Sequence, residues 1–133
     1  MGRTYGTPAG PRRRDAVAAA FDVIGAHETD LSRRFLGGVA GIPAVRLYGI
    51  EDPARLSERT PTFAVRVGDR HPFETAKILG ERGIFVWDGH YYAIELMERL
   101  GLQETGGAVR IGFCHYNTKD EVDQVLVELA SLA

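Results

Sequence analysis

The sequence has few residues that could form covalent or metal cross-links. It contains one cysteine, Cys114, so no disulfide can form within the chain, which is typical of a reducing compartment. Its four histidines have no metal-ligand spacing with one another or with Cys114. No apolar run approaches the roughly 18 residues of a membrane span, and the N-terminus lacks a signal-peptide hydrophobic region. We therefore expect a cytoplasmic protein without a bound metal or a membrane partner.

The sequence also has no large excess of charge of either sign. The 133 residues carry a net charge of −2, and the pI near 6.1 gives no reason to expect a nucleic-acid partner. The one basic cluster, residues 12–14, is interpreted as a solvated flank. The sequence has no glycine-rich phosphate loop after a strand and no Gly-x-Ser-x-Gly elbow. A hydrophobic content of 44% fits one ordinary globular domain.

The first half of the chain alternates helical and strand patterns. Residues 1–12 are expected to be an irregular tail, followed by a long helix over residues 13–39 whose apolar stripe runs from Val17 through Phe21 and Phe35. Strands are predicted at residues 45–48 and 62–67, and Pro72 is well placed to begin a helix that ends near Gly83.

The second half repeats this alternation. A β-favouring run at residues 84–87 precedes a helix expected to bury the side chains of Ala93, Leu96, Met97 and Leu100. A turn at residues 103–107 leads to a strand around Arg110. Thr118 and Glu121 form a capping box that starts an amphipathic C-terminal helix.

These elements predict an α/β (α+β) fold. Residues 13–133 are expected to form a single domain, with three or four strands covered by helices on one face and a long helix before the sheet. A small sheet built this way leaves its second face for water, a ligand or a partner.

Arg110 is the most informative residue on that second face. Val109, Ile111 and Phe113 alternate with Arg110 and Gly112, so the arginine lies on the opposite face from the apolar residues. A guanidinium beside small residues can bind a carboxylate through two hydrogen bonds. The alternative is a solvated arginine on an edge strand, and spacing alone does not decide between the two.

Four segments resemble, in order, the class V aminotransferase family of pyridoxal-phosphate enzymes, which includes the cysteine desulfurases. Residues 110–123, RIGFCHYNTKDEVD, are similar to the family's C-terminal signature. Residues 6–8 (GTP), 60–63 (TPTF) and 83–89 (GIFVWDG, with 93–97 after it) match further stretches. The resemblance runs from about Gly6 to the end of the chain.

The resemblance implies the C-terminal small domain of a larger, truncated enzyme. Family members carry the cofactor in a large N-terminal domain, where a lysine holds it covalently. Neither Lys77 nor Lys119 lies in the family's lysine motif. We therefore expect that this chain alone does not bind pyridoxal phosphate or catalyse a reaction, and that its partners are a separate large-domain chain and a second copy in a homodimer.

The resemblance also implies roles for individual residues. Arg110 matches the arginine that binds the substrate carboxylate, and Thr7 matches a threonine that reaches the cofactor phosphate of the neighbouring subunit. His90 lies in the active-site loop and is a further candidate for substrate binding. Tyr92 stands where desulfurases have their nucleophilic cysteine, which argues against desulfurase chemistry.

Two other functions remain open from the sequence. The chain could be a non-enzymatic α/β module that binds a partner protein through its uncovered sheet face. It could also be a small carboxylate-binding domain that uses Arg110. If the chain is a severed small domain, exposed apolar patches are expected at the following aromatic residues: Phe21, Phe35, Trp87, Tyr91 and Tyr92.

Overall fold

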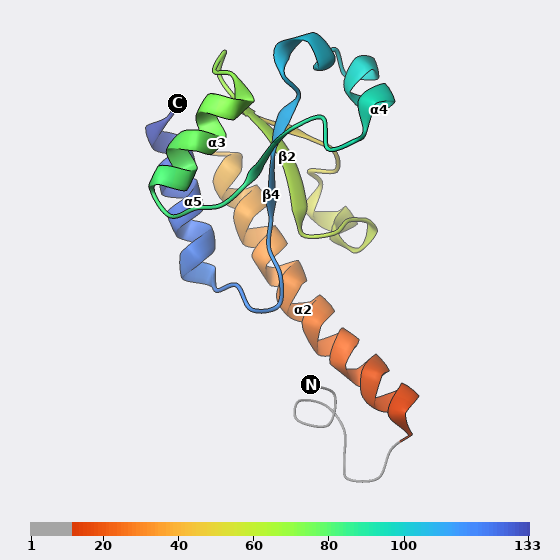
Figure 1. The fold of residues 1–133 in the computed structure, drawn as a ribbon. Coiled ribbons are helices and arrows are strands. Elements are labelled where there is room, and N and C mark those ends of the chain that lie inside the picture. The colour runs from red at the N-terminus through yellow and green to blue at the C-terminus, as the bar shows by residue number, and fades with distance from the viewer. Residues whose placement is uncertain (1–11) are drawn as a thin grey trace.

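The computed structural model describes residues 12–133, which form a four-stranded antiparallel sheet with helices (Figure 1). The strand order is β1-β2-β4-β3. The expected α/β class and long first helix are confirmed. The elements, in chain order, are α2 (Arg13–Val39), β1 (Val45–Tyr48), η1 (Pro53–Glu58), β2 (Thr62–Val67), α3 (Pro72–Glu81), β3 (Trp87–Gly89), α4 (Ile94–Arg99), η2 (Gln103–Thr105), β4 (Ala108–Gly112) and α5 (Lys119–Ser131).

Only the C-terminal half of α2 packs in the core. Leu31 and Phe35 are fully buried, whereas Phe21 is 67% exposed. Figure 1 shows the N-terminal half of this helix projecting past the sheet, where no other described element covers it. The exposure expected for Phe35 is wrong, because its ring packs at 4.4 Å from Phe63 and 5.4 Å from Phe113. The exposure expected for Phe21 is confirmed.

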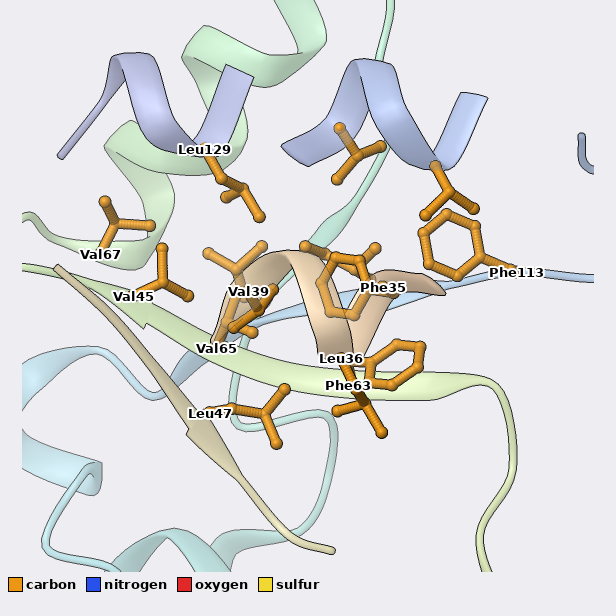
Figure 2. Packing of buried hydrophobic residues seen from close by; sticks show 14 of the residues in the cluster. Phe35, Leu36, Val39, Val45, Leu47, Phe63, Val65, Val67, Phe113 and Leu129 are labelled. Atoms are coloured by element: carbon orange, nitrogen blue, oxygen red, sulfur yellow. The ribbon is translucent and has the colours of Figure 1, made fainter. Parts of the chain in front are cut away.

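The register of the sheet separates an apolar face from a mixed one. Val45 pairs with Val67, and Phe63 pairs with Ile111, so these side chains share one face. Figure 2 shows Val45, Phe63 and Val67 on the side of the sheet that α2 and α5 cover. This face holds the main core, whose members from strands and helices include Leu31, Leu36, Val39, Leu47, Val65, Leu79, Val109, Val122, Val125 and Leu129.

Local signals in the sequence explain where the helices begin. Pro72 occupies the first turn of α3, and the predicted capping box of Thr118 and Glu121 is present at the start of α5. Arg82, just past α3, pairs with Glu128 of α5. The Arg82–Glu128 pair joins the end of α3 to α5 over the apolar face of the sheet.

The segment between α3 and η2 differs from the sequence prediction. The strand predicted at residues 84–87 lies instead at Trp87–Gly89, because pairing with β4 begins only where Trp87 meets Arg110. Ile84 and Val86 pack against the main core as a connection. The predicted burial of Leu96 and Leu100 is wrong: they are 53% and 40% exposed. The six-residue α4 buries only Met97.

The second face of the sheet is partly covered. Met97, Leu102 and Ala108 form a smaller cluster against which Tyr48 and Tyr91 pack. Arg66 of β2 donates hydrogen bonds to the carbonyl oxygens of Thr105 and Gly107, both at 2.9 Å. One end of this face is therefore closed by the segment around α4 and η2, while the end near Arg110 stays open. Within residues 12–133 no helix is both long and apolar enough to cross a membrane.

Candidate functional site

Arg110 lies in the middle of β4, on the face opposite the long helices. Its neighbours across the sheet are Ala64 of β2 and Trp87 of β3. Arg110 is exposed, whereas the adjacent Val109 is only 1% exposed and belongs to the main core. The orientation expected from the alternating pattern is confirmed. Because Ala64 and Gly112 are small, the guanidinium meets little steric hindrance on this face.

Two aromatic rings flank the Arg110 guanidinium. Its central carbon lies 5.1 Å from the ring centre of Trp87 and 5.6 Å from that of Tyr91. Both distances fit cation–π contacts. Among residues 12–133, no carboxylate forms an ion pair with Arg110 and no hydrogen bond involves its side chain. The part of the chain that the structure describes thus leaves its five N–H donors available to a ligand.

An open hollow of about 560 Å³ adjoins Arg110. Its walls combine apolar side chains with backbone exposed at small residues, and they comprise Thr62, Phe85, Val86, Trp87, Arg110, Gly112, Phe113 and Cys114. Residue spacing alone did not indicate that Thr62 or Phe85 would lie here, because that depends on the register between β2, β3 and β4. A larger hollow, about 1010 Å³, lies elsewhere between α2, β1 and η1 and does not include Arg110. We place the candidate site at Arg110 because its chemistry is more specific.

The loop after β3 has an unusual backbone. Tyr91 and Tyr92 both adopt positive φ angles, 50° and 63°, in the left-handed region that side chains other than glycine rarely occupy. The Nδ1 atom of His90 accepts a hydrogen bond from the backbone N–H of Tyr92 at 3.0 Å. This conformation turns Tyr91 toward the sheet and leaves Tyr92 86% exposed.

The hydroxyl of Tyr91 is buried and has no hydrogen-bond partner among the described residues. Burial raises the pKa of Tyr91 above its usual range, while nearby Arg110 opposes that shift and Asp88 adds to it. Tyr91 therefore stays neutral at physiological pH. A buried phenol of this kind is unsuited to act as a base, but its ring can pack against a cation.

Residues at the end of β4 form a structural turn. The side-chain oxygen of Asn117 accepts a hydrogen bond from the backbone N–H of Cys114 at 2.8 Å, and the carbonyl oxygen of Asn117 lies 2.8 Å from the ring nitrogen of His27. Asn117 is therefore a turn residue between β4 and α5. His115 is exposed and packs edge-on against Tyr116. Within residues 12–133 no group of three or more potential ligands is close enough to hold a metal ion.

Comparisons with known proteins agree with this fold. The family described as Aminotransferase class-V matches residues 16–125. The chain belongs to the class V aminotransferase family. Thr7, which the resemblance assigns to the cofactor phosphate, lies outside the described residues, and so does most of the tail expected at residues 1–12.

Relatives within the class V family are cysteine desulfurases. The one from Dickeya dadantii (strain 3937) is 33% identical over 112 residues, covering 84% of this chain and 25% of the relative. A probable cysteine desulfurase from Methanothermobacter thermautotrophicus is 33% identical over 110 residues, covering 80% and 26%. The apo structure of the Thermococcus onnurineus NA1 enzyme has a TM-score of 0.77 at 29% identity, covering 90% and 28%. The chain thus spans about a quarter of the length of the curated relatives it matches.

Pyridoxal phosphate is the cofactor of class V enzymes. The described residues do not form a complete binding site for it. Lys77 lies on α3, where it pairs with Glu81 at 3.9 Å, and Lys119 begins α5. These helices cover the apolar face of the sheet, whereas Arg110 lies on the other face. Neither amine lies beside the candidate site.

Proposed function

We propose that this chain is the C-terminal small domain of a class V aminotransferase-like enzyme and that Arg110 binds the carboxylate of its substrate. The observation that carries the proposal is an exposed guanidinium, free of ion pairs among residues 12–133, beside a hollow. A carboxylate is the anion that fits its planar pair of N–H donors. His90 is a subsidiary candidate, since the contact with Tyr92 engages only its Nδ1 atom.

The cofactor and its lysine would come from residues other than those described, on a large-domain chain. This follows from the positions of Lys77 and Lys119 on the helical face of the sheet. On this proposal residues 12–133 bind and orient the substrate carboxylate and shield one side of the site from water. Desulfurase chemistry is disfavoured by Tyr92, which stands at the position of the nucleophilic cysteine.

Several exposed apolar side chains support the proposal that another chain docks on this one. Trp87 and Phe85 are 53% and 90% exposed near Arg110, and Phe21 is 67% exposed on the projecting half of α2. We propose that a large-domain chain covers these surfaces and that, without it, the chain forms a homodimer. The alternative function, a non-enzymatic module that binds a partner protein, uses the same exposed sheet face.

The direct test is a carboxylate titration of the purified chain at low ionic strength. Acetate and L-alanine should shift the indole NMR signal of Trp87, the only tryptophan, in a saturable manner. The variant Arg110→Gln should lose this saturation. Arg46→Gln is the matched control, because Arg46 also lies over an aromatic ring, Tyr48 at 5.0 Å, on the same face. Equal binding by Arg110→Gln and the parent chain would show that Arg110 is only a surface residue.

A second test uses a complemented enzyme. With a large-domain chain supplying the cofactor, Arg110→Ala should weaken amino-acid substrates while cofactor binding stays nearly intact. Loss of a two-bond contact between a guanidinium and a carboxylate costs about 1.5–3 kcal/mol, which corresponds to about a ten- to hundredfold change in affinity. Kinetics unchanged by Arg110→Ala would contradict the proposed role.

A further inference from the structure

Arginines on the second face of the sheet and at its edge are held in different ways. Arg66 and Arg59 direct their N–H groups at backbone carbonyl oxygens, for example Arg66 at Thr105 and Arg59 at Thr62 (2.8 Å). Those donors are therefore already engaged. Arg59 also lies over one ring, that of Phe63 at 4.1 Å. Arg110 lies against two rings, those of Trp87 and Tyr91, and no hydrogen bond involves its side chain within the described chain.

This difference matters for binding. A guanidinium that contacts aromatic rings through its faces keeps the N–H donors around its edge unused. The rings also restrict the rotation of a long side chain, which lowers the entropy that a ligand must remove when it binds. An arginine held this way is both ordered and available.

The backbone around Tyr91 supports a specific purpose for this ring. Two consecutive non-glycine residues, Tyr91 and Tyr92, adopt positive φ angles, a conformation that costs about 1–2 kcal/mol per residue. Within residues 12–133 the hydroxyl of Tyr91 is buried without a partner, which is a further cost. The strained turn nevertheless places the Tyr91 ring beside Arg110. Strain of this kind is concentrated at functional sites.

We propose that Trp87 and Tyr91 are positioning residues that hold the Arg110 guanidinium in the orientation that receives a carboxylate. This inference rests on the proposed carboxylate-binding function of Arg110. Neither ring needs to touch the carboxylate. Trp87 acts from the neighbouring strand, where it directly opposes Arg110, and Tyr91 acts from the strained loop.

The test compares side chains that differ mainly in the ring. Trp87→Phe keeps an aromatic face, whereas Trp87→Leu keeps apolar bulk without one. Because Trp87 is half exposed, both variants should fold, which a thermal melt checks. Acetate affinity is measured from the side-chain N–H signals of Arg110 by NMR. We expect Trp87→Leu to bind about two- to fivefold more weakly and Trp87→Phe to bind almost as well as the parent.

Tyr91 is tested in the same way. Tyr91→Phe removes the buried hydroxyl but keeps the ring, so acetate affinity should not change. Tyr91→Leu should weaken binding by a similar two- to fivefold factor. The rate of rotation of the Arg110 guanidinium, also seen by NMR, should rise in both leucine variants. A purely structural role for the rings would alter the thermal midpoint without altering this rotation.

The outcomes separate this inference from the proposed function. If Arg110→Gln abolishes binding but Trp87→Leu and Tyr91→Leu bind as the parent does, the positioning role is wrong and the carboxylate site stands. If Arg110→Gln itself binds normally, the proposed function fails and the positioning role with it. Weaker binding in both leucine variants, with recovery in both phenylalanine variants, supports the inference.

Discussion

Arg34 of α2 and Asp123 of α5 form an ion pair joined by two hydrogen bonds, each 2.5 Å long. This pair connects the first and last helices of the described chain across the surface of the core. The Arg34 guanidinium holds the pKa of Asp123 below its ordinary value of 3.8. The pair is exposed, so its effect on stability should be modest and should weaken with salt.

The Asp123 pKa shift predicts a pH dependence. Because the folded pKa is depressed, the stabilising contribution is fully present above about pH 4 and is lost as the pH falls through the folded pKa. Asp123→Asn should therefore flatten the decrease in unfolding free energy over this acidic range. Urea denaturation between about pH 5 and pH 2 measures it. Asp30→Asn is the control, because Asp30 pairs with Arg33 within α2 only; an equal flattening by both variants would contradict the prediction.

Gly107 is predicted to be intolerant of a side chain. A Cβ at this position would lie 2.1 Å from the carbonyl oxygen of Gly89, and its φ is +77°. Gly83 has a similar φ of +81° but nothing within 4 Å, so it isolates the cost of backbone strain. Gly83→Ala should lower the unfolding free energy by about 1–2 kcal/mol. Gly107→Ala should cost about 1–3 kcal/mol more because the β3–β4 contact must open. Equal thermal midpoints for the two variants would rule out the close approach.

Tyr92 offers a stabilising substitution. Its side chain is 86% exposed and its φ is +63°, so Tyr92→Gly relieves strain and removes little packing. We expect the unfolding free energy to rise by about 0.5–1 kcal/mol. Tyr116→Gly is the matched control: Tyr116 is 73% exposed, also packs edge-on against a histidine, and has no positive φ. It should lower stability by about 0.5–1 kcal/mol, and a loss in both variants would show that the loop is not strained.

The chain alone should not retain pyridoxal phosphate. Lys77 and Lys119 lie on the helices that cover the opposite face of the sheet from Arg110, so neither can hold the cofactor at the site. After mixing and dialysis, the visible cofactor absorbance should be lost, and borohydride treatment should then add no cofactor mass to either lysine. A retained band, with mass added at one lysine, would show that the chain binds the cofactor by itself.

The fold was largely predictable where a local pattern determined it. The helix from Arg13, the strands at residues 45–48 and 62–67, and the Thr118 capping box follow from spacing and caps. The limits of β3 were not predictable, because they depend on which residues face Arg110 on a strand distant in sequence. The exposure of Leu96 also escaped prediction: an apolar pattern shows which side of a helix is apolar but not whether another layer covers it.

The candidate site was predicted only in part. Alternation along β4 was enough to place Arg110 on the open face, away from Val109. The contact of Tyr91 with Arg110 could not be predicted from the sequence. Tyrosine has no preference for the left-handed backbone that directs its ring toward the sheet. The sequence showed three aromatic residues near one another, yet only Trp87 and Tyr91 contact Arg110, while Tyr92 is directed into solvent.

The strand order has a consequence for synthesis on the ribosome. The inner strand β4 is the last of the four to be made, and β2 cannot gain its second partner until Thr62 can pair with Gly112. Until then, β1 and β2 can form only a hairpin whose apolar side packs against α2, through Phe35 and Phe63, while the part that α5 covers stays exposed. Pairing between distant segments slows folding and leaves intermediates that are prone to aggregate. We therefore expect the hairpin and α2 to become stable only once β4 and α5 have both been made.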